Sequence, residues 1–418
     1  MSDEKHIFAD IDDKLLACIH CGLCLDFCPT YRVTHEEMSS PRGRIYLMKA
    51  VNEGALDIAD PLVQEHELSC LVCRACETAC PSGVQYSVLM EHTRDAIAQT
   101  GSRGPLHRFV YTNVLGSRAL TRLGQFCLAL LSRTRLLRLA RKTFDTTTGI
   151  FAPLRITPDS IPFPHDRDGV YPTTKQHIGS VGLLIGCIGD VFTKQVNDAT
   201  IVVLNALGYD VHTIPEISCC GALASHAGYG EHARTLARTT LHAIERSGVD
   251  YFITNIAGCG ATMKEYSKML GASHPAQAKI KDISEFLFEH HLSDLERLGL
   301  RFDEPTHISY HAPCHLYHGQ KIVDLPAQLL RTIANAKVTV LEENDICCGS
   351  AGTYNVERPE MARELLARKM EIIGSAGAPV VATANAGCLM QLQSGLRERH
   401  DGAQAYHFIE VIASRIRA

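Results

Sequence analysis

Two cysteine runs near the N-terminus constrain this chain more than any other feature of its sequence. Residues 18–29 read CIHCGLCLDFCP, and residues 70–81 read CLVCRACETACP. Both runs follow the pattern C-x2-C-x2-C-x3-C-P, in which proline fixes φ and turns the chain just after the last cysteine. Whatever fold the first hundred residues adopt, it must place eight cysteines at closely controlled positions.

Whether these cysteines form disulfides or bind metal depends on the compartment in which the chain resides. The first sixteen residues, MSDEKHIFADIDDKLL, lack the basic segment and apolar core of a secretory signal, and no apolar run approaches about 18 residues. We therefore expect a cytoplasmic chain without a membrane span. Seventeen cysteines in a reducing compartment predict metal ligation rather than disulfides. The net charge of −5 gives no reason to expect nucleic acid as a partner.

The spacing within each run is that of bacterial ferredoxins. Three cysteines two residues apart bring three thiolates to one cluster, and the fourth points at the other cluster in two-cluster ferredoxins. We therefore predict two [4Fe–4S] clusters that exchange their fourth ligands: Cys18, Cys21, Cys24 and Cys80 for the first, and Cys70, Cys73, Cys76 and Cys28 for the second. Zinc is the alternative, but zinc sites commonly use two C-x2-C pairs separated by a longer loop.

Eight further cysteines recur in an internal repeat in the second half of the chain. They are Cys187, Cys219, Cys220 and Cys259 in the first copy, and Cys314, Cys347, Cys348 and Cys388 in the second, at offsets of 127 to 129 residues. Each follows a predicted strand, and alternating strands and helices predict parallel α/β lobes whose strand ends gather the cysteines. Recurrence in register favours a metal or redox role over buried thiols.

Three single residues are interpreted more simply. Gly221 and Gly349 follow the paired cysteines, and we expect them to let the backbone pass close to the sulfur atoms. Cys127 stands alone on a predicted helix and is expected to be a buried structural residue.

The predicted fold class is α+β and multidomain. A helical two-cluster [4Fe–4S] ferredoxin domain covers residues 1–100, and two α/β repeats named for their CCG motif cover 177–300 and 301–418. Residues 101–176 are predicted to form basic amphipathic helices followed by a Thr- and Pro-rich linker, residues 146–176, without a rigid fold.

Residues 103–142 contain no acidic residue but nine basic ones: Arg103, Arg108, Arg118, Arg122, Arg133, Arg135, Arg138, Arg141 and Lys142. Interleaved apolar stretches such as FCLALL predict one or two basic amphipathic helices. Two interpretations remain open. Such helices rest on an anionic membrane surface in some proteins, and in others they are solvated or face another subunit.

Taken with the segment SPRGRIYLMKA at residues 40–50, these motifs cover nearly the whole chain. In combination they resemble the iron-sulfur subunits of bacterial glycolate oxidase (glycolate dehydrogenase), which belong to the CCG-domain, heterodisulfide-reductase-like iron-sulfur proteins. Similar architectures occur in the iron-sulfur subunit of anaerobic glycerol-3-phosphate dehydrogenase and in lactate-utilisation iron-sulfur proteins.

The resemblance implies an electron-transfer subunit of an oxidoreductase. An FAD-containing partner subunit would oxidise glycolate, a 2-hydroxy acid, to glyoxylate, and this chain would pass electrons singly through [4Fe–4S] clusters towards a quinone-type acceptor. One of the two interpretations of the basic segment, contact with a membrane, would place the chain peripherally on the inner face of the cytoplasmic membrane. This chain has no dinucleotide-binding G-x-G-x-x-G after a predicted strand, no P-loop and no recognisable nucleophile constellation. We therefore expect no catalytic residue here and substrate oxidation on the flavin partner.

The chain departs from the heterodisulfide reductase pattern, in which each CCG motif ends in C-x2-C. Thr262 and Gln391 stand where the fifth cysteines would be. Four cysteines per repeat are compatible with one further iron-sulfur cluster in each repeat and with metal-free repeats.

Two other functions stay open: thiol–disulfide chemistry at the CCG cysteines, and a metal-stabilised scaffold that assembles flavoprotein subunits. His311 and His315 flank Cys314 and are candidates for ligands, for donors to ligands, or for core residues.

Overall fold

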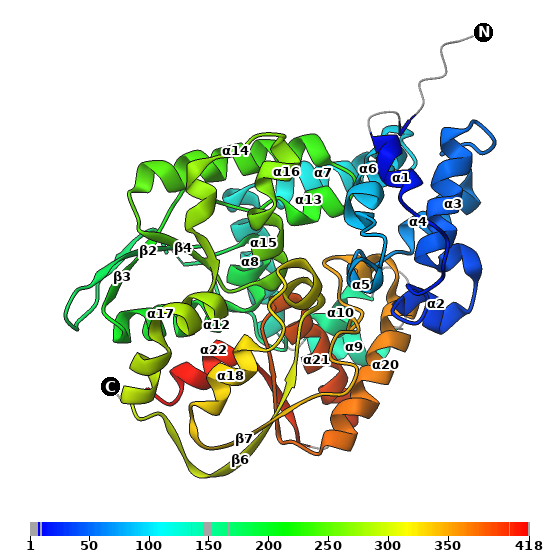
Figure 1. Cartoon of the computed structure of the whole chain (residues 1–418). Helices are drawn as coiled ribbons and strands as arrows, with labels where there is room; N and C mark the ends of the chain where they lie inside the picture. Colours follow the sequence, from blue (N-terminus) through cyan, green and yellow to red (C-terminus); the bar gives the residue numbers. More distant parts are fainter. Residues whose placement is uncertain are drawn as a thin grey trace.

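The computed structural model describes residues 7–8, 11–134, 136–144, 152–165, 167–400 and 402–416. Its N-terminal part is built of short helices around the cysteine loops (Figure 1). These are α1 (Asp12–Leu16), α2 (Pro29–Thr34), η2 (Glu37–Ser39), α3 (Pro41–Asn52), α4 (Pro61–Leu68), α5 (Ala75–Ala79) and α6 (Tyr86–Gln99).

Local sequence explains where these helices begin. Proline opens α2, α3 and α4, at the position where its missing N–H costs nothing. The Ser40 side chain accepts a hydrogen bond from the Gly43 amide, and the Asp60 side chain accepts one from the Leu62 amide, so both cap their helices. The helices bury Phe8 and other apolar side chains in a core of their own.

The segment that follows forms α7 (Gly104–Phe109), the π-helical turn η3 (Val110–Val114), α8 (Arg118–Arg133) and α9 (Leu136–Thr143). The predicted helices are therefore present. The predicted linker is more ordered than expected. It contains α10 (Pro153–Ile156) and β1 (Gly169–Tyr171), and β1 pairs antiparallel with the first sheet. Residues 146–151 and 166 of that linker lie outside the described residues.

The first repeat forms a five-stranded sheet in the order β1-β3-β2-β4-β5. Apart from β1, its strands are parallel: β2 (Gly179–Leu183), β3 (Tyr209–Thr213), β4 (Tyr251–Thr254) and β5 (Ile280–Asp282). Its helices are α11 (Cys187–Phe192), α12 (Lys194–Ala206), α13 (Ala222–His226), α14 (Gly230–Ser247), α15 (Ala257–Lys264), α16 (Tyr266–Leu270), η5 (Pro275–Lys279) and α17 (Ile283–Arg297).

The second repeat forms a four-stranded parallel sheet in the order β7-β6-β8-β9. Its strands are β6 (Arg301–His311), β7 (Ala334–Val340), β8 (Val380–Thr383) and β9 (Gln404–His407). Its helices are η6 (His315–Gly319), α18 (Leu325–Arg331), α19 (Tyr354–Glu357), α20 (Pro359–Ala376), α21 (Ala386–Arg399) and α22 (Phe408–Ala413). The predicted parallel α/β architecture is thus confirmed.

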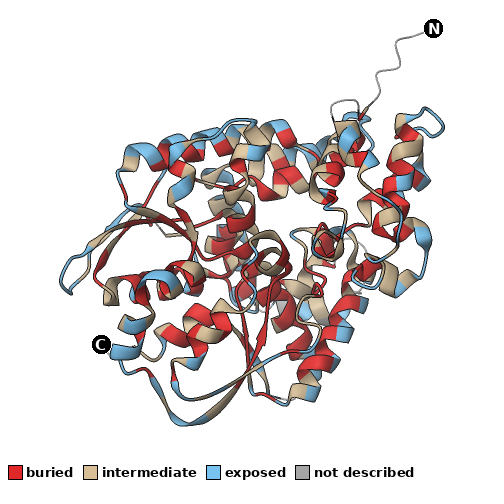
Figure 2. Cartoon of the chain, viewed as in Figure 1, coloured by how far each residue is buried: buried red, intermediate tan, exposed pale blue. Residues whose placement is uncertain are grey.

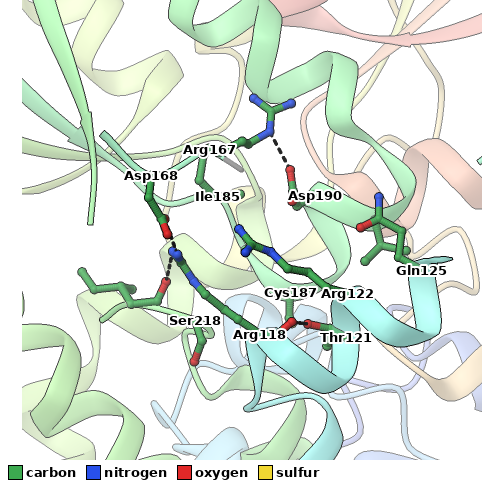
Figure 3. Close-up of a pocket in the computed structure, with 13 residues that line it drawn as sticks. Arg118, Thr121, Arg122, Gln125, Arg167, Asp168, Ile185, Cys187, Asp190 and Ser218 are labelled. Atoms are coloured by element: carbon green, nitrogen blue, oxygen red, sulfur yellow. Dashed lines mark hydrogen bonds and ion pairs between the residues drawn. The ribbon is translucent and has the colours of Figure 1, made fainter. Parts of the chain in front are cut away.

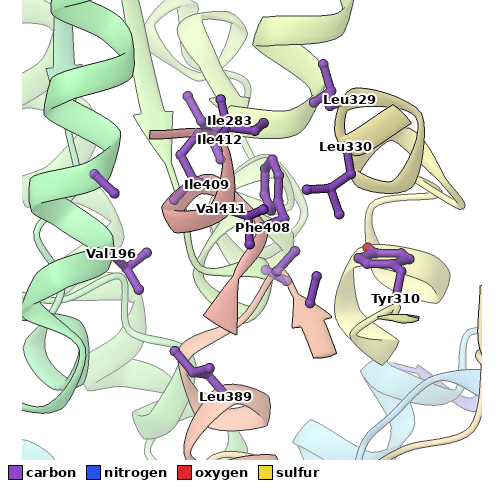
Figure 4. Close-up of a cluster of buried hydrophobic side chains, with 14 of the residues drawn as sticks. Val196, Ile283, Tyr310, Leu329, Leu330, Leu389, Phe408, Ile409, Val411 and Ile412 are labelled. Carbon is purple, nitrogen blue, oxygen red and sulfur yellow. The ribbon is translucent and has the colours of Figure 1, made fainter. Parts of the chain in front are cut away.

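One apolar core joins the two repeats. Val196 of α12 and Ile283 of α17 come from the first repeat, and Tyr310 and Phe408 come from the second, yet all lie in the same buried cluster (Figure 4). Figure 2 shows buried residues on the elements that lie between the two sheets. The hydrophobic effect therefore holds the repeats together as one body.

The N-terminal helices dock on both repeats through charged and polar contacts. Arg74 Nη1 lies 2.7 Å from Glu265 Oε2 of the first repeat, and Arg94 donates to the carbonyl oxygen of His226 at 2.6 Å. The Tyr354 hydroxyl of the second repeat donates to the carbonyl oxygen of Ser69 at 2.8 Å. Among the described residues, no helix is long and apolar enough to cross a bilayer.

Candidate metal centres

Four buried cysteines from the two N-terminal runs line one small cavity: Cys28, Cys70, Cys73 and Cys76. Cys28 precedes α2, Cys70 and Cys73 lie on the loop that leads into α5, and Cys76 lies in the first turn of α5. Val72 and Arg74 adopt positive φ values of 51° and 66°, which coil that loop tightly. Burial raises the pKa of the Cys73 and Cys76 thiols well above the ordinary value. Thiolates at this position therefore require a cation, and four of them around one cavity fit a metal cluster.

Arg44 supplies positive charge beside this cavity, which it also lines. It is fully buried and donates to the carbonyl oxygen of His66 at 2.7 Å and to the side chains of Thr30 and Ser69 at 3.0 and 2.8 Å. Its Nη1 lies 4.0 Å from Cys28 Sγ. Sequence reasoning did not single out Arg44. The feature of the sequence that could have identified it is a charged residue among the apolar residues of α3.

The other four N-terminal cysteines lie nearer the surface. Cys18, Cys24 and Cys80 all pack against the apolar core of the N-terminal helices, and Cys21 is exposed. Burial raises the pKa of the Cys24 thiol to about 11, with the nearby sulfur atoms of Cys28 and Cys18 adding to the shift. The loop turns at His20 and Gly22, which have φ values of 55° and 88°. A cluster held here would be the more accessible of the two to a partner protein.

The cysteines of the first repeat meet where its parallel strands end. Cys187 begins α11 after β2, the Cys219–Cys220 pair follows β3, and Cys259 lies in α15 after β4. The Sγ atoms of Cys187 and Cys219 are 3.5 Å apart. Hydrogen bonding with Cys187 and Cys220 holds the pKa of the Cys219 thiol well below its ordinary value, and Cys220 also interacts with Cys259. All four side chains form one connected group.

The second repeat places its cysteines in the same way, and all four are buried. The Sγ atoms of Cys314 and Cys347 are 3.9 Å apart. Hydrogen bonding also links Cys348 to Cys347 and to Cys388, and burial adds to the rise in the pKa of the Cys348 thiol.

The two histidines that flank Cys314 have different surroundings. His315 donates from Nε2 to the carbonyl oxygen of Val72 at 3.0 Å, and burial lowers its pKa to about 3. His315 therefore anchors the second repeat to the N-terminal cysteine loop. His311 points to Cys348 and Cys388.

The backbone gives a further reason, besides the expected approach to sulfur, for the glycines after the paired cysteines. Gly221 and Gly349 have φ values of 84° and 87°, and a Cβ at Gly349 would lie 2.6 Å from the carbonyl oxygen of Ala362 in α20. Glycine is needed because the backbone is left-handed and passes close to a helix. One contact with sulfur does occur, because the Gly221 amide donates to Cys219 Sγ at 3.4 Å.

The cysteine groups adjoin one another through the molecule. Cys73 of the N-terminal loop packs with Cys314 and Cys347 in a small apolar cluster. The segments beside the last cysteine of each repeat also meet, because the Ala257 amide donates to the Ala384 carbonyl oxygen at 3.3 Å. The cysteines of the second repeat therefore adjoin the N-terminal cysteine loop, and the two repeats meet near their last cysteines.

A small pocket opens beside Cys187, between α8 and the first repeat (Figure 3). Arg118 closes one wall by donating to the carbonyl oxygens of Ile214 and Ile217 at 3.1 and 3.2 Å. Arg167 pairs with Asp190 at 2.7 Å on another wall. Cys187 is the one cysteine of its group on this pocket.

The outer face of α8 is apolar and exposed. Leu123, Phe126 and Leu130 keep 60%, 49% and 53% of their surface accessible. Cys127 lies on this helix as expected, but it is exposed rather than buried. It follows Phe126 on the outer side of a helix whose buried residues are Gln125, Ala129 and Ser132.

The basic residues of this region are partly engaged within the chain. Arg103, Arg118 and Arg141 form ion pairs with Glu357, Asp168 and Asp159, and the Arg133 guanidinium stacks on Phe163. Arg135 and the side chains of Arg138 and Lys142 lie outside the described residues. The described arginines therefore offer less free positive charge than their number suggests.

Two family models match the chain. A 4Fe-4S dicluster domain matches residues 14–84, and a cysteine-rich domain matches twice, at residues 181–264 and 308–393. The N-terminal part is thus a dicluster domain, whose eight cysteines fit two iron-sulfur clusters, and the internal duplication is confirmed.

Relatives extend the match to nearly the full length. The probable glycolate oxidase iron-sulfur subunit of Bacillus subtilis is 34% identical over 96% of this chain and 94% of its own. The glycolate oxidase iron-sulfur subunit of Escherichia coli is 33% identical over the same shares. A lactate utilization protein of an Exiguobacterium species is 26% identical over 56% of this chain and 96% of its own. On this evidence, the chain belongs to the family of glycolate oxidase iron-sulfur subunits.

Proposed function

We propose that this chain is the iron-sulfur electron-transfer subunit of a glycolate (2-hydroxy acid) dehydrogenase. An FAD-containing partner subunit oxidises glycolate to glyoxylate, and electrons pass singly through [4Fe–4S] clusters of this chain towards a quinone-type acceptor. Clusters of this kind accept one electron at a time, and a flavin that has taken up two electrons can release them singly to such an acceptor. Relatives named for glycolate oxidase over nearly the full length support this substrate.

The observation that carries this proposal is the adjacency of the cysteine groups. The first group, Cys18, Cys21, Cys24 and Cys80, lies nearest the surface, and the second, Cys28, Cys70, Cys73 and Cys76, is buried behind it. The second group packs against the cysteines of the second repeat, whose loops meet those of the first repeat. We propose these two groups as the ligand sets of two [4Fe–4S] clusters, and one further cluster for each repeat.

The electron acceptor is proposed to approach from the side of α8. The pocket beside Cys187 lies directly under that helix, and Thr121, Gln125 and Ser218 provide polar groups on its wall. In this proposal, the electron path begins at the cysteine group nearest the surface, that of Cys21, and ends at the pocket beside Cys187.

The test is the content of iron and acid-labile sulfide per chain in protein purified without oxygen. Four clusters predict roughly sixteen irons, while the N-terminal clusters alone give roughly eight. Replacing Cys347 and Cys348 together by serine should remove about four irons and leave the remainder. A wild-type value near eight would mean that the repeats use their cysteines for other chemistry, and zinc in place of iron would overturn electron transfer altogether.

We further propose that α8 rests on the surface of the cytoplasmic membrane, so that the protein is peripheral. Its exposed leucines and phenylalanine offer apolar area, and the surrounding segment has basic but no acidic residues, which suits anionic lipid. Because several arginines are paired within the chain, the apolar side chains should dominate the contact.

Replacing Leu123, Phe126 and Leu130 together by glutamine is therefore expected to weaken binding to vesicles of anionic phospholipid at least about 100-fold, since each buried apolar side chain contributes about 1.5–3 kcal/mol. Vesicle co-sedimentation measures this change. The control is Leu62→Gln, because Leu62 on α4 is 71% exposed and far from the segment in sequence. Unchanged vesicle binding of the triple variant would assign this face to a subunit interface instead.

A further inference from the structure

His311 occupies an unusual position for a histidine. It is the last residue of β6, three residues before Cys314, and none of its surface is exposed. Neither ring nitrogen has a hydrogen-bond partner among the residues that the structure describes. A buried imidazole without partners is costly, so the position requires something that interacts with a ring nitrogen.

The neighbours of His311 indicate what that is. One ring nitrogen of His311 and the Sγ atoms of Cys348 and Cys388 all lie within 4.8 Å of one another, and all three residues are buried. Two ligands of one metal ion, each about 2.0–2.3 Å from it, are at most about 4.6 Å apart. The three donor atoms lie close to that limit, so a small movement of the side chains would let them share a metal, and Cys314 and Cys347 adjoin them through the sulfur contacts of the same group.

The first repeat serves as an internal comparison. Leu184 stands three residues before Cys187, as His311 stands three residues before Cys314. Leu184 is buried in an apolar cluster that also contains Cys220. At this position the duplication therefore has an apolar residue in one copy and a nitrogen donor in the other.

We infer that His311 is a ligand of the metal centre in the second repeat, so that an imidazole and thiolates hold this centre, whereas thiolates alone hold the centre of the first repeat. The inference rests on the proposal that the second repeat binds metal. An imidazole adds no negative charge, and histidine ligands raise the reduction potential of iron-sulfur centres relative to cysteine. The centre of the second repeat should therefore accept electrons more readily than an all-cysteine centre in the same surroundings.

The test compares His311→Leu, which reproduces the residue of the first repeat, with the full-length wild type, both purified without oxygen. The matched control is His307→Leu on the same strand, because His307 bonds to the Thr339 hydroxyl at 2.9 Å rather than facing cysteines. Metal per chain is measured first. Pulsed electron paramagnetic resonance of the reduced proteins then detects nitrogen bound to iron, identified by labelling histidine with ¹⁵N. If the second repeat holds zinc, X-ray absorption at the zinc edge detects the same nitrogen.

Wild type and His307→Leu are expected to show a histidine nitrogen bound to metal, and His311→Leu is expected to lose that signal completely. His311→Cys should keep the metal, lack the nitrogen signal and have a lower reduction potential, which separates loss of a ligand from loss of folding. A nitrogen signal that persists in His311→Leu would overturn the inference, as would metal in the second repeat of the wild type without bound nitrogen. If the second repeat of the wild type holds no metal, the proposed function of that repeat fails first and the inference with it.

Discussion

Replacing Arg44 by methionine is expected to lower the free energy of unfolding by about 3–5 kcal/mol and to empty the site of Cys28, Cys70, Cys73 and Cys76. The guanidinium is fully buried, and its donors tie together α2, the end of α4 and the loop after it, through Thr30, the His66 carbonyl and Ser69. Methionine has a similar length, but it can replace none of these hydrogen bonds.

Electrostatic interactions make the expected decrease in the free energy of unfolding larger than the decrease from removing an ordinary polar contact. Ligated thiolates are anionic, and the Arg44 guanidinium is the positive charge that the structure buries against Cys28. Burial raises the pKa of the nearby Glu67 carboxyl to about 8, which weakens the negative charge that it offers to the arginine near neutral pH. The charge of Arg44 is thus best matched by the cysteines.

Arg42 provides the control for this experiment. It lies on the same helix, but its guanidinium is partly exposed, pairs with Glu37 at 2.6 Å and donates to the carbonyl oxygen of His20, in the other cysteine loop, at 3.3 Å. Arg42→Met should change the free energy of unfolding by no more than about 1 kcal/mol, as is usual for a surface ion pair. Denaturant unfolding and iron content per chain measure both variants. Equal effects of the two substitutions would show that Arg44 does not support the cysteine loop.

Replacing Gly349 by alanine is the second substitution with a large expected effect, about 2–4 kcal/mol of destabilisation with loss of metal from the second repeat. A left-handed backbone costs an alanine about 1–2 kcal/mol, and its Cβ would lie 2.6 Å from the backbone carbonyl of Ala362. Relief of that contact requires Cys347 and Cys348 to shift, because they directly precede the glycine.

The duplication supplies the matched variant, Gly221→Ala. Its backbone is equally left-handed, but the nearest atom to the new Cβ would be 3.2 Å away. The expected cost is therefore about 1–2 kcal/mol, which is the backbone contribution alone. Unfolding curves and metal analysis of the two variants give the comparison. If Gly221→Ala proved the more damaging of the two, close packing against α20 would not be the reason for the glycine at 349.

Local sequence patterns were sufficient to predict much of the fold of this protein and its candidate metal centres. The spacing of the N-terminal cysteines predicted a dicluster domain, and the recurrence of Cys187, Cys219, Cys220 and Cys259 at a constant offset predicted the duplication. The parallel strands followed from the alternation of apolar runs and helical segments. In each case the information lies within a short window or in the comparison of two such windows.

Errors arose where distant segments decide the environment. Cys127 has the sequence context of a buried helical residue, but it is exposed on the outer side of α8. The Thr- and Pro-rich segment reads as a linker, yet β1 finds a partner in β3 some forty residues later. Burial and strand pairing depend on what packs against a segment, which its own composition does not specify.

The sequence by itself determined the family, the two kinds of cysteine motif and the parallel α/β repeats, because ligand spacing and periodicity are local properties of a chain. Only the tertiary structure decided that the repeats share one core, that Arg44 faces the cysteines of the buried N-terminal group, and that His311 rather than His315 lies unpartnered beside two thiols among the described residues. These are contacts between residues far apart in the chain, and burial and electrostatics act through such contacts.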